Sequence, residues 1–329
     1  MFVIDFSTHL TKKDYPVRNV RISPDSGTLA ATFGAEGKAT EVAWWSRTED
    51  KLIATRLIAQ NGEEIWAEPV FDLTLSKCLI HHRSASVDEI VVLTQTDSNQ
   101  VGARFSITTD DRLEDVRLCA FAVSRNSEWL LSGHDGGDLA LSGLRFQPLN
   151  PTLTRKQQPW VRDPDERNGV RLATSLEFTP DSKYIAAGCG DGEVRLLTFA
   201  SGRLRGTLNF PELERINKSV RGLRFTENSS LLAVQSGGRI AVFSLEQKST
   251  AAQLQPTELT DMAFTPDGRR MLTGGMDKLV RVWDTTTWKE IAQYDWKIGP
   301  IHSVTVSPDG LTAAAGGDKS RVVVWDVES

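Results

Sequence analysis

The tripeptide Val-Trp-Asp occurs twice in this chain, forty-two residues apart, at Val282–Asp284 and Val324–Asp326. Each copy follows a Ser/Thr-Pro-Asp-Gly turn and a Gly-Gly step, so the repeated stretches are Met262–Asp284 and Val304–Asp326. Both stretches alternate apolar and polar residues around two tight turns, which predicts three antiparallel strands. A period of about 40 residues is typical of a β-propeller.

Weaker copies of the same unit occur earlier in the chain. The Ser or Thr that ends each first strand recurs at spacings of 39 to 55 residues, at Ser23, Ser76, Ser124, Thr179, Thr226, Thr265 and Ser307. The repeat therefore predicts an all-β fold, a seven-bladed β-propeller of four-stranded antiparallel blades.

The two ends of the chain are predicted to share one blade. The last copy stops after its third strand, and the apolar stretch Phe2–Phe6 has no partner near it in the sequence. Pairing Phe2–Phe6 with Val322–Asp326 would cover an exposed strand edge and close the ring. We therefore expect residues 1–8 to supply the closing strand, and residues 1–329 to form a single domain whose fold is complete.

These repeats resemble the WD-repeat (WD40) propeller family over the whole chain, and the resemblance implies roles for several residues. In that family an Asp of the second turn joins a buried Ser/Thr, His and Trp. Thr273 and Trp283 match the Ser/Thr and the Trp, and Trp325 matches the Trp of the last blade. No matching Gly-His step precedes any blade, which predicts a divergent member. The second-turn residues expected to be structural are Asp191, Asp277 and Asp318.

One stretch interrupts the repeat between the third and fourth blades. Residues 143–172 contain four prolines and Trp160, and proline removes backbone donors from a strand ladder. We interpret Leu144–Gln147 as an outer-strand remnant and residues 148–169 as a surface insertion. Trp160 would then either contact a partner or fold back onto the side of the propeller.

Composition narrows the functional classes. The net charge of −5 disfavours a dedicated nucleic-acid binder, and no apolar run approaches the roughly 18 residues of a membrane helix. The N-terminus lacks the pattern of a secretory signal. The three cysteines, Cys78, Cys119 and Cys189, fall in different predicted blades, which favours buried thiols in a reducing compartment. We expect a cytoplasmic protein, or a nuclear one if it is eukaryotic.

The sequence shows no catalytic, metal or cofactor constellation. Gly34–Thr40 has only two residues between its glycines and Ala after its lysine, so it fits a turn rather than a phosphate-binding loop. The five histidines lack zinc-ligand spacing, and no Gly-x-Ser-x-Gly elbow is present. We therefore expect a non-enzymatic protein without a cofactor.

Partners are expected on the top face of the ring, where residues flanking the first apolar position of each inner strand point to the rim. The family resemblance places seven candidates there, one of which, Met276, lies just before a second turn. They are Arg18, Phe71, Arg117, Arg221, Thr260, Met276 and His302. Arginine and aromatic residues are common interface anchors, and arginine binds carboxylate or phosphate with paired hydrogen bonds. The pattern favours protein partners with acidic or phosphorylated segments, although ordinary solvated charges would look the same.

Three functions remain open. The first is a non-catalytic scaffold that holds partner proteins in a larger complex. The second is a nucleic-acid-associated propeller that uses the arginine ring, and it predicts salt-sensitive binding. The third is an enzyme or small-molecule binder in the channel, which the small and apolar inner-strand residues disfavour.

Overall fold

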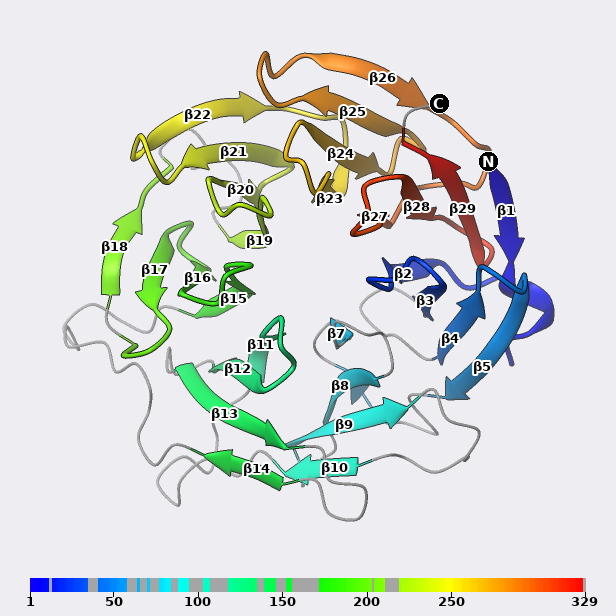
Figure 1. Cartoon of the computed structure of the whole chain (residues 1–329), viewed down its shortest axis with the longest axis horizontal. Coiled ribbons are helices and arrows are strands. Elements are labelled where there is room, and N and C mark those ends of the chain that lie inside the picture. The colour runs from blue at the N-terminus through cyan, green and yellow to red at the C-terminus, as the bar shows by residue number, and fades with distance from the viewer. Residues whose placement is uncertain are drawn as a thin grey trace. The chain divides into compact units, whose positions relative to one another are not determined.

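The computed structural model describes most of the chain and divides it into two compact units (Figure 1). Unit 1 comprises Met1–His82, Val92–Gly102 and Leu254–Ser329, and unit 2 comprises Arg83–Val91 and Ala103–Gln253. The residues that the structure describes are 1–11, 14–34, 41–57, 64–65, 70–71, 77–83, 88–94, 103–106, 118–134, 139–145, 152–155, 172–202, 204–210 and 219–327.

Unit 1 contains three antiparallel four-stranded blades. Their strands, in sheet order, are β2 (Val17–Ile22), β3 (Thr28–Phe33), β4 (Glu41–Ser46) and β5 (Lys51–Leu57); β23 (Leu259–Phe264), β24 (Arg270–Gly275), β25 (Val280–Asp284) and β26 (Glu290–Tyr294); and β27 (Ser303–Val306), β28 (Thr312–Gly316), β29 (Arg321–Asp326) and β1 (Phe2–Asp5). The first strands β23, β27 and β2 contact one another in that order, so we call the first strand of each blade its inner strand.

Unit 2 contains three further blades of the same kind. Their strands are β11 (Leu118–Val123), β12 (Trp129–His134), β13 (Leu139–Arg145) and β14 (Thr152–Arg155); β15 (Ala173–Phe178), β16 (Tyr184–Cys189), β17 (Val194–Thr198) and β18 (Leu204–Leu208); and β19 (Val220–Phe225), β20 (Leu231–Ser236), β21 (Arg239–Ser244) and β22 (Ser249–Leu254). Inner strand β15 contacts β11 on one side and β19 on the other.

The remaining sheet departs from the four-strand pattern. Its order is β10-β9-β8-β6, and β7 also pairs with β8; the strands are β6 (Glu64–Ile65), β7 (Val70–Phe71), β8 (Lys77–Arg83), β9 (Asp88–Thr94) and β10 (Ala103–Ser106). The described residues thus form a β-propeller with six regular four-stranded blades, where the sequence predicted seven. The two-residue strands β6 and β7 pair with β8 in this sheet, in place of a single inner strand. Ser76, which the repeat predicted to end the inner strand of this blade, lies outside the described residues.

Burial explains the composition of the strands. The second strand of each regular blade is almost fully buried, and it is rich in Ala and Gly, as in Tyr184–Cys189 and Thr312–Gly316. The outer strands alternate exposed and partly exposed residues, as in Leu204–Leu208. Small residues therefore lie where neighbouring blades pack closely, and polar residues lie at the perimeter.

The Ser or Thr that set the repeat period closes the first hairpin turn of each regular blade. In β23–β24 the Thr265 hydroxyl donates to Asp267 Oδ1 at 2.6 Å and accepts the Arg270 N–H at 3.0 Å. The same pair of bonds recurs at Ser23, Ser124, Thr179, Thr226 and Ser307. Burial alone would raise the pKa of Asp267, but the bonds from Thr265 and the Arg269 N–H lower it below its ordinary value.

A glycine in the second strand sets how closely the next blade can pack. A Cβ atom on Gly274 would lie 2.6 Å from Ile301 Cγ2, which belongs to the segment leading into β27. Cβ atoms on Gly188 and Gly316 would overlap Val220 and Val17, the first residues of the neighbouring inner strands. The Gly-Gly step of the repeat is therefore a packing requirement between blades.

The predicted pairing of the N-terminal strand with the last blade is confirmed. β1 runs antiparallel to β29, with Phe2 opposite Val324 and Asp5 opposite Arg321. The pairing ends one residue earlier than predicted, because the chain turns into the 3-10 helix η1 (Phe6–Thr8).

The segment after β1 attaches to the blade β2–β5. The buried Phe6 ring packs 5.1 Å from Phe33 and 5.6 Å from Trp45, measured between ring centroids. The buried Glu41 carboxylate accepts the Thr11 N–H at 3.1 Å and the Thr11 hydroxyl at 3.0 Å. Burial raises the pKa of Glu41, although both bonds from Thr11 act against that shift. Residues 1–11 thus join the last blade to the first.

The predicted insertion boundary is wrong at its N-terminal side. Leu144 and Arg145 belong to β13, the third strand, and the outer strand is β14 (Thr152–Arg155), inside the predicted insertion 148–169. The Thr-Leu-Thr-Arg stretch suits a strand, and both Pro148 and Pro151 precede it in the sequence. Trp160 and residues 156–171 lie outside the described part.

Candidate interaction surface

The loops before the inner strands and the second turns of the blades are joined at one end of unit 1. The Met276 N–H donates to the Glu258 carbonyl at 2.9 Å, and the Asp318 N–H donates to the Ile298 carbonyl at 2.8 Å. The Gly34 N–H donates in the same way to the Pro16 carbonyl at 3.2 Å. We call this surface the top face of unit 1 and define it by Arg18, Glu258, Met276, His302 and Asp318.

Backbone hydrogen bonds also connect neighbouring blades under this face. The Ile301 N–H donates to the Gly275 carbonyl at 3.0 Å, and the Val17 N–H donates to the Gly317 carbonyl at 2.9 Å. Each bond joins the start of one blade to the second turn of the blade before it. The top face therefore consists of turns held by main-chain bonds on both sides.

Met276 is the exposed apolar residue of this face. Its side chain is 44% exposed, while the flanking Gly275 is buried. The turn that carries it is fixed by Asp277, whose carboxylate accepts from Arg281 at 2.5 Å and from the Leu279 N–H at 3.3 Å. Asp277 thus fixes the turn that carries Met276.

His302 and Asp318 form a pair that the sequence did not predict. His302 Nε2 lies 2.8 Å from Asp318 Oδ1, and the His302 side chain is 12% exposed against 40% for Asp318. We expected His302 to contact partners and Asp318 to be a structural residue of its turn. The two lie sixteen residues apart and meet only because the loop before β27 folds against the turn after β28.

Thr260 and Arg18 also make bonds within the fold. The Thr260 hydroxyl lies 2.8 Å from the Gly274 carbonyl and 2.7 Å from the Ile301 carbonyl, and so ties β24 to the next blade. Thr174 is placed in the same way in unit 2, between the Gly188 and Val220 carbonyls. Arg18 donates through Nε to the Gly34 carbonyl at 3.2 Å.

The other predicted partner-binding residues are not brought together in unit 1. Arg221 is exposed on β19 of unit 2. Phe71 is half-buried on β7, opposite the buried Cys78 of β8. Arg117 lies outside the described residues. Of the three arginines in the predicted ring, the structure describes Arg18 and Arg221, so the ring stays a prediction.

The predicted structural residues are placed as follows. Trp283 and Trp325 are 9% and 5% exposed, so their predicted burial is confirmed. The Trp283 indole N–H donates to the Thr273 hydroxyl at 2.9 Å. The Trp325 ring lies 4.3 Å from Trp296, which carries aromatic packing across two blades. Asp191 accepts the Glu193 N–H at 3.1 Å within its turn.

Sequence reasoning missed a hydrogen-bonded row across three inner strands. Asp261 Oδ2 in β23 accepts the Ser303 hydroxyl of β27 at 2.9 Å and the Val304 N–H at 3.1 Å. Ser303 Oγ in turn accepts the Val20 N–H of β2 at 3.2 Å. The sequence does contain a pattern that could have indicated this row. A polar residue directly precedes the central apolar residue of each of the three inner strands, at Asn19, Asp261 and Ser303.

Neither a metal-ligand cluster nor a membrane-spanning helix is found among the described residues of the chain. None of their His, Cys, Asp and Glu side chains gather in threes as a metal ion would require. Within the same part of the chain, no helix is long and apolar enough to span a bilayer. No disulfide joins the three cysteines; Cys78 and Cys189 are buried, whereas Cys119 is half-buried rather than buried as predicted.

Comparison with known proteins finds a repeat-family model and several distant relatives that match parts of this chain. The family model described as WD domain, G-beta repeat matches residues 167–197, 251–284 and 289–326. A guanine nucleotide-binding protein subunit beta-like protein 1 from Mus musculus is 24% identical over 68% of this chain and 68% of its own length. A serine-threonine kinase receptor-associated protein from Gallus gallus is 25% identical over 61% of this chain and 53% of its own length.

A bacterial relative shows the same repeat. An uncharacterized WD repeat-containing protein from Synechocystis is 25% identical over 44% of this chain and 42% of its own length. The chain thus aligns with about two fifths to two thirds of the length of these relatives.

Proposed function

We propose that the chain is a divergent member of the WD-repeat family and a non-catalytic scaffold that binds partner proteins through its top face. WD-repeat propellers are generally interaction scaffolds rather than enzymes. One relative is named as similar to a subunit of a guanine nucleotide-binding protein, and another is named as a protein associated with a receptor. These names support the class of function and not a particular partner.

The exposure of Met276 on a fixed turn is the observation that carries this proposal. An apolar side chain that is 44% exposed loses contact with water when a partner covers it, which favours association. The turn is held by Asp277 and by the Glu258 carbonyl, so little ordering is needed on binding. An exposed anchor on a rigid loop is the arrangement that protein interfaces use most effectively.

The charges around Met276 bear on the chemistry of the partner. His302 lies against Asp318, so this pair adds no separate positive charge to the top face. Within the described part of the chain, Arg18 makes one hydrogen bond, through its Nε–H, and arginine has five N–H donors. We propose that Arg18, with Arg221 and Arg117, contacts acidic or phosphorylated segments of the partner, while Thr260 and His302 hold the face in shape.

We further propose that the sheet β6–β10 is an irregular blade. Six regular blades share one strand order, and the irregular sheet lies between β5 and β11 in the sequence, where one blade is expected. The pairing of β1 with β29 gives the last regular blade its fourth strand.

The test is affinity capture from the native cell followed by quantitative mass spectrometry, with the wild-type chain and two matched variants. Met276→Asp places a charge on the top face, and Ile291→Asp places one on β26, an outer strand of the same blade, where Ile291 is 53% exposed. Partners lost with Met276→Asp and kept with Ile291→Asp support the proposal. Equal capture by all three proteins contradicts it.

A second experiment separates acidic partners from nucleic acid. The triple variant Arg18→Glu, Arg117→Glu and Arg221→Glu should weaken capture of an acidic partner while circular dichroism stays unchanged. If the wild-type chain instead binds a generic oligonucleotide with an affinity that falls steeply with salt, the nucleic-acid alternative replaces the protein partner.

A further inference from the structure

The outer strand β1 differs from the other outer strands whose side chains are described. β5, β18 and β26 each carry one strongly exposed large apolar residue: Leu57, Leu204 and Ile291. β1 carries two in succession, because Phe2 is 42% exposed and Val3 is 48% exposed. Strand β1 also ends its sheet, since its order is β1-β29-β28-β27. An apolar strand with an unpaired edge is a template for another strand.

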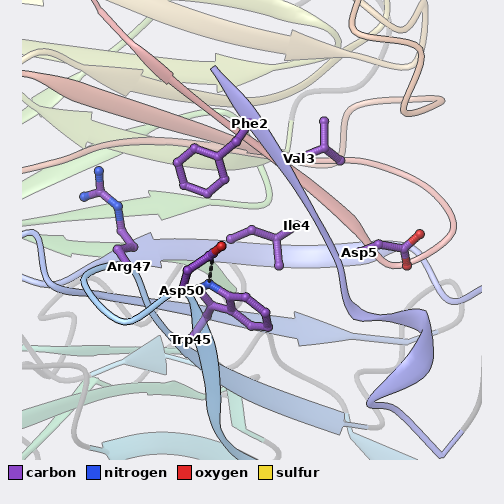
Figure 2. A pocket seen from close by; sticks show the side chains of 7 residues that line it. All are labelled: Phe2, Val3, Ile4, Asp5, Trp45, Arg47 and Asp50. Carbon is purple, nitrogen blue, oxygen red and sulfur yellow. Dashed lines mark hydrogen bonds between the residues drawn. The ribbon is translucent and has the colours of Figure 1, made fainter.

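A cavity of about 300 Å³ lies beside this edge, between β1 and the turn that follows β4. Figure 2 shows Phe2 and Ile4 on the side of β1 that faces Trp45 and Asp50, with Val3 and Asp5 on the opposite side. The buried Ile4 and the half-buried Trp45 give the cavity an apolar floor. A volume of this size is at the lower end for ligand sites and accommodates one large side chain.

The charges at the cavity decide which occupant fits. Arg47 is committed within the fold, because its two terminal nitrogens donate to the Ser26 carbonyl at 2.6 Å and to the Thr312 hydroxyl at 3.0 Å. Asp50 is exposed, accepts the Trp45 indole N–H at 3.3 Å, and forms no ion pair with any described residue. The negative charge of Asp50 is therefore the one at this cavity that a ligand can match.

We propose that β1 and this cavity bind an extended segment of a partner protein that adds as a strand to the free edge of β1. The segment carries an apolar side chain that enters the cavity between Phe2 and Trp45. Two residues away on the same face it carries an arginine or lysine that meets Asp50, because side chains two apart share one face of a strand. This site is on the perimeter of the propeller and is separate from the top face.

The experiment uses the whole chain and a fluorescein-labelled capped peptide, Thr-Phe-Thr-Arg-Thr-Val, with fluorescence anisotropy as the readout. The matched peptide has Glu in place of Arg. We expect the Arg peptide to bind about tenfold more tightly than the Glu peptide, because only the Arg side chain forms a favourable charge contact with Asp50. Equal binding of the two peptides, or no binding of either up to about 1 mM, overturns the proposal.

Three variants locate the binding. Phe2→Ser should weaken the Arg peptide about fivefold or more. Asp50→Asn should remove the preference for Arg over Glu; Asn suits this turn because Asp50 has φ 49° and Asn tolerates that region. Leu204→Ser, a similarly exposed position on β18, should bind as the wild type does. Loss of binding with Leu204→Ser, or no loss with Phe2→Ser, overturns the assignment.

Thermal unfolding of each variant checks that the fold is intact, and light scattering measures the mass of the wild-type chain. A wild-type dimer that Phe2→Ser converts to a monomer would show that a second copy occupies the edge. That outcome overturns the partner-peptide proposal.

Discussion

Replacing Gly274 by Ala adds one methyl group at the junction between two neighbouring blades. The new Cβ atom would lie 2.6 Å from Ile301 Cγ2 and 3.1 Å from Val304 Cγ1, both closer than van der Waals contact. Ile301 is 0% exposed and Val304 is 1% exposed, so neither side chain can swing into solvent. The strain must be relieved by moving the blades apart or by unfavourable rotamers.

The expected cost is about 3 kcal/mol of unfolding free energy. Overpacking a tight core typically costs about 1–3 kcal/mol, and two buried neighbours place Gly274→Ala at the upper end. Gly206→Ala is the matched control, because Gly206 also lies in a strand but nothing is within 4 Å of its added Cβ. That control should be neutral or stabilising by up to about 1 kcal/mol, since Ala restricts the unfolded chain.

Urea unfolding followed by circular dichroism measures both effects, and a double-mutant cycle assigns them. Ile301→Ala alone removes a buried side chain and should cost about 2–5 kcal/mol. Combined with Gly274→Ala, it removes the atom at 2.6 Å, so the double variant should be more stable than the sum of the two losses by about 1 kcal/mol or more. Additive losses, or a Gly274→Ala variant as stable as Gly206→Ala, would refute the close-packing argument.

Three further predictions concern hydrogen bonds and the chain ends. Thr273→Val should lower the unfolding free energy by about 1 kcal/mol, because it leaves the Trp283 indole N–H without its acceptor. Trp283→Ala should lower it by about 3–5 kcal/mol. Urea unfolding measures both losses, and an unchanged stability of Trp283→Ala would contradict the blade register. Because the pKa of Asp267 is lowered in the fold, its stabilising contribution is complete above the unfolded value, about 3.9, and is lost as pH falls through the folded pKa. Asp267→Asn should therefore narrow the gap between unfolding free energies at neutral and acid pH, and an unchanged gap would show that Asp267 does not contribute. Deleting residues 1–8 removes β1 and two buried apolar side chains, so the melting temperature should fall by an amount equivalent to about 3–6 kcal/mol, whereas an unchanged value would contradict the pairing of β1 with the last blade.

Local repeats in the sequence predicted most of the fold. The Ser/Thr-x-Asp turns, the burial of Trp283 and Trp325, and the pairing of the N-terminal strand all depend on short motifs or on one unpaired apolar stretch. Motifs of this kind encode local hydrogen bonds and periodicity directly, so a single sequence is enough to find them. The number of regular blades was not predicted correctly, because the copy around β6–β10 lacks the motifs that define the others.

Pairings between distant residues could not be read from the same patterns. His302 meets Asp318, and Asp261 meets Ser303, through packing of loops and inner strands that belong to different positions of the repeat. The outer strand β14 was missed because nearby prolines obscured a four-residue strand. A side chain's partner across a blade junction depends on the angle between blades, which local sequence does not specify.

The hydrogen bonds that were hard to predict also shape what the top face can bind. Arg18, Thr260 and His302 had been grouped by position, yet each has a different use in the fold. The Thr260 hydroxyl lies between two carbonyls, His302 lies against Asp318, and Arg18 makes one hydrogen bond, through Nε, among the described residues. An interface on this face would therefore combine one apolar contact at Met276 with one cationic contact at Arg18. Since Met276 lies on a turn held by main-chain bonds and Arg18 lies in strand β2, a change of either side chain should alter affinity far more than it alters the fold.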